Sequence, residues 1–218
     1  MWVSIVVPPM DTVTGSDTAY DRVANYLDSL SYQMLMTILV VAVLAVVISL
    51  LWSIFVTAPL EVGRDRYFME SRQALPPAAT VTSVFRTPYM NVVKVQFLRN
   101  LKIVVGTLLL VVPGIYWSFC YALVPYLLAE NPYLSTTRAM QLSKDIMDGE
   151  KFHYFVLALS FIGWNMLCSL TLGIGFFFLE PYKQATEAEF YAAMRSKALA
   201  QGLTTTEELG GFVRHESY

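Results

Sequence analysis

The chain has 218 residues, of which 56% are hydrophobic and 15% are charged, and its mean hydropathy is +0.50. Soluble domains carry roughly one quarter charged residues, so this composition excludes an ordinary soluble domain. The net charge of −2 lacks the strongly basic character that nucleic-acid binding requires, and we expect no nucleic-acid partner.

Residues 1–33 form an acidic segment in which Arg22 is the only basic residue. After a break at Gly15 and Ser16, apolar residues recur at helical spacing. This spacing predicts an amphipathic helix that lies on the membrane surface or on the protein itself. The apolar face of this helix consists of Tyr20, Val23, Ala24, Leu27 and Leu30.

The clearest membrane span is block 34–60, which is uncharged and close to the ~20 residues that a crossing requires. It ends at Pro59. A loop rich in basic residues follows, and such loops favour the cytoplasmic side, which places the N-terminus outside. Within this loop, we predict a proline-containing linker over residues 74–90. We predict a helix over Asn91–Lys102 that runs into the next block. The basic residues of the loop are Arg64, Arg66, Arg72, Arg86, Lys94, Arg99 and Lys102.

Block 103–129 is the longest stretch without a charged side chain. Its 27 residues make about 40 Å of helix at ~1.5 Å per residue, against a hydrocarbon core of ~30 Å. This length is too great for one upright span and too small for two. We therefore predict a kink or a tight reversal at Pro113 and Gly114, where an amide hydrogen is missing and the backbone is permissive.

A helix that does not span the membrane is predicted after this block. Ser135 can accept a hydrogen bond as its N-cap, Gly149 fits its C-terminal cap, and the residues between them are amphipathic. Near the end of the chain a polar helix begins at Tyr182, and residues 201–218 are expected to form a mobile C-terminal tail.

Block 154–179 is apolar and is interrupted at Gly173 and Gly175. Two topologies are open for this block and for block 103–129. If each turns back at its glycines, nearly all basic residues lie on the cytoplasmic side. The second arm of the last block would then carry Glu180 and further charges into the membrane, where each charge is costly. We therefore favour three single, kinked spans.

These elements predict an all-α, polytopic helical membrane protein with spanning helices broken at Pro and Gly and with amphipathic interfacial helices. The expected organisation has three parts. They are the acidic N-terminal segment 1–33, the helical membrane domain 34–200 with blocks 34–60, 103–129 and 154–179, and the C-terminal tail 201–218.

Seven strings along the chain carry a family resemblance. They are PLEVGRDRYF (59–68), NVVKVQFLRNL (91–101), LLLVVPGI (108–115), VPYLLAENPYLS (124–135), SFIGW (160–164), TLGIGF (171–176) and PYKQATEAEFY (181–191). In this order they make the chain resemble the bacterial integral membrane proteins grouped as domain of unknown function 975. The resemblance implies a multi-pass protein of the bacterial cytoplasmic membrane without assigned chemistry. Such proteins usually begin with a basic stretch and one more hydrophobic segment, where this chain has only Trp2–Val7.

The sequence shows no reactive cluster at membrane depth, which is where a membrane enzyme would reveal itself. His153 lies at a block end and His215 in the expected tail, and no metalloprotease, phosphate-loop or nucleophile-elbow motif is present. Cys120 and Cys168 lie in apolar blocks, which is typical of cysteines that pack as small hydrophobic residues. We predict no enzyme activity, no cofactor and no metal site.

The candidate functional or helix-break positions lie at the ends and interruptions of the blocks. The carboxylates can pair with nearby bases such as Arg64 or Lys183 and so cap the bundle. Alternatively, the broken helices expose backbone groups at a shared site, as discontinuous helices do in transporters. The candidates are Glu61, Arg64, Pro113, Gly114, Glu130, Gly173, Gly175 and Glu180.

We therefore expect a non-enzymatic scaffold or accessory subunit of a membrane complex. Its partners would be membrane lipids and either further copies of the chain or another membrane protein. A small transporter or channel that uses the Pro- and Gly-broken helices is the alternative.

Overall fold

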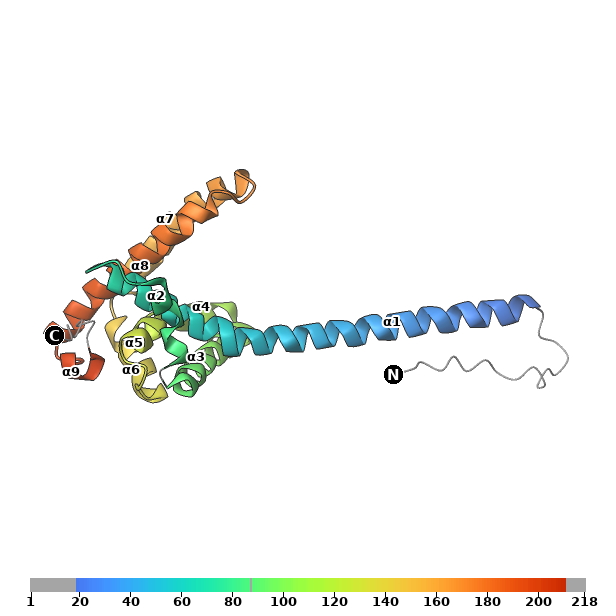
Figure 1. Cartoon of the computed structure of the whole chain (residues 1–218), viewed down its shortest axis with the longest axis horizontal. Coiled ribbons are helices and arrows are strands. Elements are labelled where there is room, and N and C mark those ends of the chain that lie inside the picture. The colour runs from blue at the N-terminus through green and yellow to red at the C-terminus, as the bar shows by residue number, and fades with distance from the viewer. Residues whose placement is uncertain (1–18, 87, 211–218) are drawn as a thin grey trace. The chain divides into compact units, whose positions relative to one another are not determined.

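The computed structural model describes residues 19–86 and 88–210. Within these residues the regular structure is helical and contains no strand (Figure 1). The chain divides into two compact units between Leu50 and Leu51, and each unit is described by itself.

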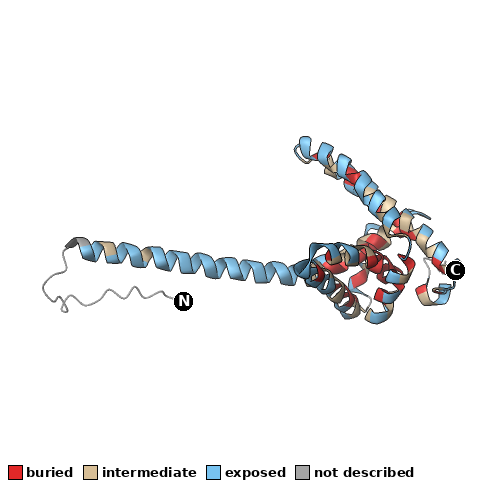
Figure 2. Cartoon of the chain, turned by 180° about the vertical axis from the view of Figure 1, so that it is seen from behind, coloured by how far each residue is buried: buried red, intermediate tan, exposed pale blue. Residues whose placement is uncertain are grey.

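In the first unit the structure describes helix α1 (Ala19–Trp52), whose last two residues belong to the second unit. This helix begins in the expected amphipathic segment and continues through the first apolar block. Residues 31–50 are all exposed (Figure 2). The amphipathic segment and the apolar block therefore belong to one helix, because no Gly or Pro interrupts the sequence between Ser16 and Pro59.

The expected end of this span at Pro59 is not an end of helical structure. The π-helical turn η1 (Ser53–Thr57) leads directly into α2 (Ala58–Ser71), which has Pro59 in its first turn. Proline cannot donate to the carbonyl four residues before it, which is that of Phe55. The hydroxyl of Tyr89 donates to this carbonyl instead, so the proline is accommodated without a break.

The second unit is built around a short, fully buried helix, α5 (Val124–Glu130). Helices α2, α3 and α6 pack against it and form the main hydrophobic core, seen as the buried part of the body in Figure 2. The remaining elements are η2 (Ala78–Phe85), α3 (Tyr89–Leu109), α4 (Val111–Cys120), α6 (Thr136–Ile146), α7 (Lys151–Leu170), α8 (Phe176–Ala200) and α9 (Thr206–Leu209).

Helices α3 and α4 form an antiparallel hairpin, so the expected single kinked span over block 103–129 is wrong. The backbone is extended at Leu110, where φ is −160° and ψ is 139°. Across the hairpin, Arg99 Nε donates to the carbonyl of Tyr121 at 2.9 Å. Pro113 lies in the first turn of α4, where its missing N–H removes no helical hydrogen bond, and it therefore begins a helix instead of kinking one.

Gly114 lets the two arms of this hairpin approach closely. A Cβ atom at this position would lie 2.6 Å from the Cα of Thr107 on the opposite arm. Real Cβ atoms do not come this close to backbone atoms, so a side chain at residue 114 would force the arms apart. The glycine expected to permit a kink or a reversal thus serves as a close contact between the two arms of the hairpin.

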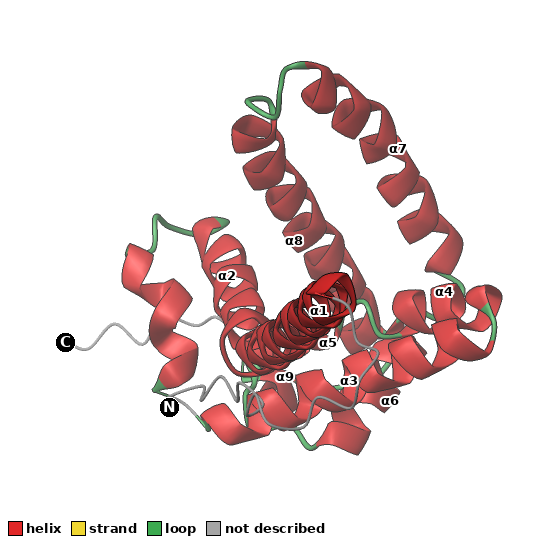
Figure 3. Ribbon diagram, turned by 90° about the vertical axis from the view of Figure 1, so that its right-hand side faces the viewer, coloured by secondary structure: helices red, strands yellow, loops and turns green. Residues whose placement is uncertain are grey.

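Helices α7 and α8 form a second hairpin (Figure 3), and the expected single span over block 154–179 is also wrong. The rings of Phe161 and Tyr182 meet across the arms with their centroids 5.9 Å apart. In the turn, Gly173 has a φ of +88° and donates its N–H to the carbonyl of Cys168 at 3.2 Å, which closes the end of α7. Gly175 is the close-contact position, because a Cβ there would lie 2.7 Å from Cys168 Sγ.

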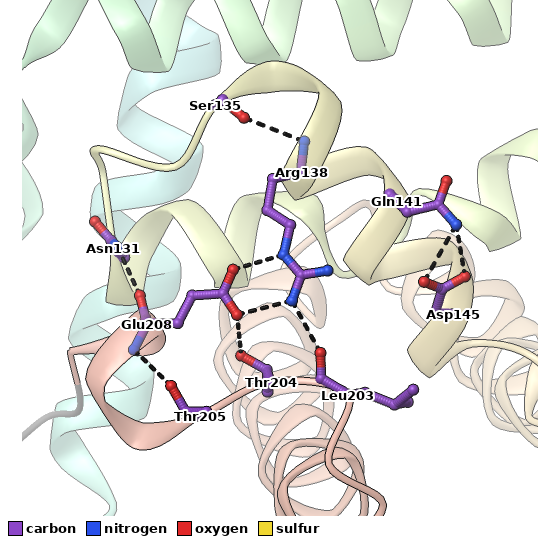
Figure 4. Close-up of polar contacts among 9 residues, drawn as sticks. All are labelled: Asn131, Ser135, Arg138, Gln141, Asp145, Leu203, Thr204, Thr205 and Glu208. Atoms are coloured by element: carbon purple, nitrogen blue, oxygen red, sulfur yellow. Dashed lines mark hydrogen bonds and ion pairs between the residues drawn. The ribbon is translucent and has the colours of Figure 1, made fainter.

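The C-terminal tail also differs from the expectation, because residues 201–210 pack against the body (Figure 4). Arg138 of α6 donates from Nη2 to Glu208 Oε2 at 2.8 Å and to the carbonyl of Leu203 at 2.9 Å. Asn131 Nδ2 donates to the carbonyl of Glu208 at 2.6 Å, and Leu209 is fully buried. The packed structure therefore extends to Gly210, and residues 211–218 lie outside the described part of the chain.

Candidate functional site

Charged groups gather inside the second unit where α2 faces its neighbours. Asp65 is only 2% exposed, and Arg64 Nη2 donates to its Oδ1 at 3.1 Å. Glu61 lies one turn earlier on α2, and its Oε1 is 3.9 Å from Nη1 of Arg99 on α3. One turn of α2 thus carries two carboxylates and one guanidinium group, and a second guanidinium group, from α3, packs against it.

Arg99 connects this group to the α3–α4 hairpin. Besides its bond to the Tyr121 carbonyl, its Nη1 lies 3.5 Å from Gln96 Oε1. Gln96 is fully buried, and its Nε2 has no hydrogen-bond partner within the described residues. A buried donor without an acceptor is costly, so this turn of α3 contains a polar group that packing alone does not satisfy.

Helix α8 contributes three polar side chains from one face, because Glu187, Tyr191 and Arg195 are spaced four residues apart. Tyr126 of α5 donates from its hydroxyl to Glu187 Oε2 at 3.4 Å. The rings of Tyr126 and Tyr191 stack with their centroids 5.3 Å apart. Burial raises the pKa of Glu187 above its usual value, because the surrounding helices remove water from its carboxylate.

Glu130 ends α5 and forms the most enclosed ion pair of the described structure. Its side chain is 0% exposed, and it accepts from Arg195 Nη2 at 2.7 Å. Tyr191 also donates its hydroxyl to Glu130 Oε2 at 2.7 Å. A buried carboxylate is tolerated when a partner charge and hydrogen bonds replace water, and both are present here. The pair fastens the end of the core helix to α8.

The expected site residues do not converge on one point. Glu61 and Arg64 belong to the charged group on α2, and Glu61 pairs with Arg99 instead of Arg64. Glu130 lies at the end of α5, and Glu180 is exposed on α8. The remaining candidates occupy the two hairpin turns, with Pro113 and Gly114 in one and Gly173 and Gly175 in the other.

Sequence reasoning missed the residues that complete these interactions, namely Asp65, Arg99, Tyr126, Glu187, Tyr191 and Arg195. A signal for three of them was present in the four-residue spacing of Glu187, Tyr191 and Arg195, which predicts one polar stripe on a helix. The same spacing separates Tyr126 from Glu130 on α5.

The polar groups of this arrangement form ion pairs and hydrogen bonds between helices. Within residues 19–86 and 88–210, no group of three or more His, Cys, Asp or Glu side chains is placed to hold a metal ion. Cys120 and Cys168 are both free and buried. His153 is largely exposed and lies 2.9 Å from Glu150, its neighbour one turn earlier. The described side chains thus pair with one another and join helices.

The fold defines a helical membrane protein. Within residues 19–86 and 88–210, three helical stretches are by length and composition able to cross a membrane, namely Asp21–Ser71, Val111–Glu130 (α4 and α5) and Lys151–Leu170. Residues 12–198 match the family described as Protein of unknown function (DUF975), and the chain belongs to this family. The match confirms the resemblance that the seven strings indicated. No curated protein and no solved structure matches the chain.

Proposed function

We propose that this protein is a non-enzymatic scaffold or accessory subunit of a membrane complex, and that α1 is the element that associates with a second membrane helix. The observation that carries the proposal is the exposure of α1. The most apolar stretch of this helix lies within residues 31–50, which are all exposed. A membrane helix with an exposed apolar surface can present that surface to lipid or to another helix.

Small residues on α1 support helix association. Ala42, Ala45 and Ser49 lie on one face at helical spacing, which allows the backbone of a second helix to approach closely. Val47 lies on the opposite face. The partner is a second copy of the chain or another membrane protein.

The proposal includes a topology in the bacterial cytoplasmic membrane. In it, α1 crosses the bilayer with its N-terminal end outside, because the basic residues after it favour the cytoplasmic side. The two hairpins then enter the membrane from the cytoplasmic side and return. From Lys102 to the turn at Leu110, α3 rises about 12 Å, which is less than half of the ~30 Å hydrocarbon core.

The exposed apolar tips support insertion of both hairpins, and the insertion of the α3–α4 hairpin is shallow. The tip of the α3–α4 hairpin consists of Leu108, Leu109, Leu110, Val111 and Val112, and that of the α7–α8 hairpin of Leu170, Leu172, Ile174, Phe177 and Phe178; all ten are exposed. Apolar groups buried at the boundary between headgroups and acyl chains, ~5–10 Å deep, hold such elements at a membrane.

Native mass spectrometry of protein gently extracted from its host membrane tests the proposal. We expect a complex with a fixed ratio of subunits, either with a second protein or with further copies. Ala45→Leu should dissociate it, because the larger side chain prevents close approach, and Val47→Leu is the matched control. A monomer that carries only lipid, with both variants behaving alike, would overturn the scaffold assignment.

That outcome would favour the transport alternative, which rests on the broken helices. The pairing of Glu130 with Arg195 and Tyr191 gives this alternative less support, because a carboxylate held by two partners is not free to bind a substrate. Liposome flux that falls in Glu130→Gln and Glu180→Gln variants would be its positive test.

A further inference from the structure

An open cavity of about 280 Å³ lies between α3 and α6, apart from the charged group on α2. Two lysines line it, one from each helix, together with polar and apolar side chains. The lining residues are Leu98, Lys102, Tyr121, Thr136, Thr137, Met140, Gln141 and Lys144.

Helical spacing explains why these side chains share the cavity. On α3, Leu98 precedes Lys102 by one turn, and on α6 Thr137, Gln141 and Lys144 lie along one stripe. Lys102 Nζ lies 5.5 Å from the centroid of the Tyr121 ring, a cation–π contact that holds the ammonium group at the cavity.

The cavity has a positive lining. It contains the ammonium groups of Lys102 and Lys144 and no carboxylate. The nearest acidic residue on the same helix, Asp145, accepts hydrogen bonds from Gln141 Nε2 at 2.9 and 3.2 Å (Figure 4). The cavity therefore offers an anion of moderate size two ammonium groups and the hydroxyl groups of Thr136 and Thr137.

The position of the cavity along the hairpin identifies the anion. Lys102 is the last charged residue of α3 before the uncharged tip, and Tyr121 lies beside it on the returning side of the hairpin. When the tip inserts as described above, the cavity lies at the depth of the lipid headgroups. This step rests on the proposed insertion of the hairpin and is independent of any partner of α1.

We propose that this cavity binds the phosphate group of an anionic phospholipid. Lys102 and Lys144 contact the phosphate, and the hydroxyl of Thr137 donates a hydrogen bond to the headgroup. Leu98 and Met140 contact the less polar part of the lipid near its glycerol backbone. A free phosphate ion shares the charge of this ligand but lacks its apolar part.

Native mass spectrometry of the full chain in a neutral detergent tests the site. The protein is titrated in parallel with dihexanoyl phosphatidylglycerol, dihexanoyl phosphatidylcholine and inorganic phosphate. We expect preferential retention of phosphatidylglycerol. A basic residue near an anionic surface contributes about fivefold in binding constant, so Lys102→Gln/Lys144→Gln should lower the retention by roughly 25-fold.

Two controls separate the cavity from general charge. Arg86→Gln/Lys94→Gln removes the same charge outside the cavity and should retain the lipid. Thr137→Phe fills the cavity without changing its charge and should weaken retention at least several-fold. Equal retention by the two double variants, or no effect of Thr137→Phe, would overturn the proposal. So would displacement of the lipid by inorganic phosphate at equal concentration, because the site would then recognise free phosphate.

Discussion

The body of the second unit buries charged side chains, whereas the tips of its two hairpins expose large apolar side chains. In the body, Glu130 and Asp65 are buried and each is hydrogen-bonded to an arginine. At the tips, large apolar side chains are exposed, and Leu172 is 95% exposed. A surface of this kind is costly in water and inexpensive in lipid, which supports the proposed insertion of the tips into a membrane.

The two regions also differ in what joins their helices. In the body, an ion pair and stacked tyrosines hold α5 against α8. Along the hairpins, glycines bring one arm directly onto the other, as Gly114 does at Thr107. Substitutions in the two regions should therefore fail for different reasons, loss of a partner in the body and steric overlap in the hairpins.

The largest effect is expected in the body, for Arg195→Met. The substitution leaves the Glu130 carboxylate buried without its partner charge, which costs about 3–5 kcal/mol. Denaturant unfolding of the purified protein in detergent, followed by circular dichroism, measures the free energy of unfolding.

Lys197→Met is the matched control for this prediction. Lys197 lies on the same helix and pairs with Glu150, but its side chain is 44% exposed. Exposed pairs contribute about 0–1 kcal/mol. Equal losses in the two variants would mean that burial of the Glu130 pair does not matter.

A smaller loss is expected in the hairpin, for Gly114→Ala. The new Cβ overlaps with Thr107 backbone atoms, and overpacking of this kind costs about 1–3 kcal/mol. Gly163→Ala on α7 is the control, because nothing lies within 4 Å of its Cβ position, and alanine there should stabilise the helix by up to about 1 kcal/mol. The same unfolding measurement decides, and a stabilising Gly114→Ala would contradict the close approach of α3 and α4.

The smallest effect is a local dependence on pH at the C-terminal segment. The hydrogen bonds from Arg138 hold the pKa of Glu208 below its usual value of 4.5. The ionised carboxylate therefore stabilises the packed segment fully above that value, and the stabilisation is lost as the pH falls through the lower, folded-state pKa. Proteolysis at residues 203–209 should increase below about pH 4.5.

Arg138→Met should show the increased proteolysis already at neutral pH, with global stability lowered by about 1 kcal/mol or less. Glu208→Gln should remove most of the dependence on pH, because the amide does not titrate. Cleavage that stays independent of pH in the unmodified protein would contradict the role of this pair.

Much of the helical structure could be predicted because its signals are local. Ser135 caps α6 as expected, and its side chain accepts from the N–H of Arg138. Gly149 follows that helix with a φ of +79°. The helix expected over Asn91–Lys102 is present within α3. Each of these depends on residues within a few positions of one another.

The reversals were considered, but single kinked spans were favoured over them, because a kink and a turn share the same residues. Pro113 and Gly173 are compatible with both, and the decision depends on contacts between the arms, such as that of Phe161 with Tyr182. The charged residues of α8 were taken as evidence against a hairpin, and this interpretation failed for a related reason. Glu187 and Glu189 are directed to Tyr126 and Arg72 of the body, which the local pattern of charge does not reveal.

The candidate site was predicted only in part. Glu61, Arg64 and Glu130 were identified because acidic and basic residues stand out beside apolar blocks. Their partners Arg99 and Arg195 lie far along the chain. The spacing of residues along one helix shows which face is polar, but it does not show which other helix packs against that face.

The pair of Glu130 and Arg195 has a consequence for synthesis of the protein. Each hairpin can close as soon as its own two arms have been made, but Glu130 must wait for a partner 65 residues later in the chain. At typical rates of translation this interval lasts about 3–13 s. During that time the Glu130 carboxylate lacks the guanidinium of Arg195 and the hydroxyl of Tyr191, so the contact between α5 and α8 is completed only after α8 has been made.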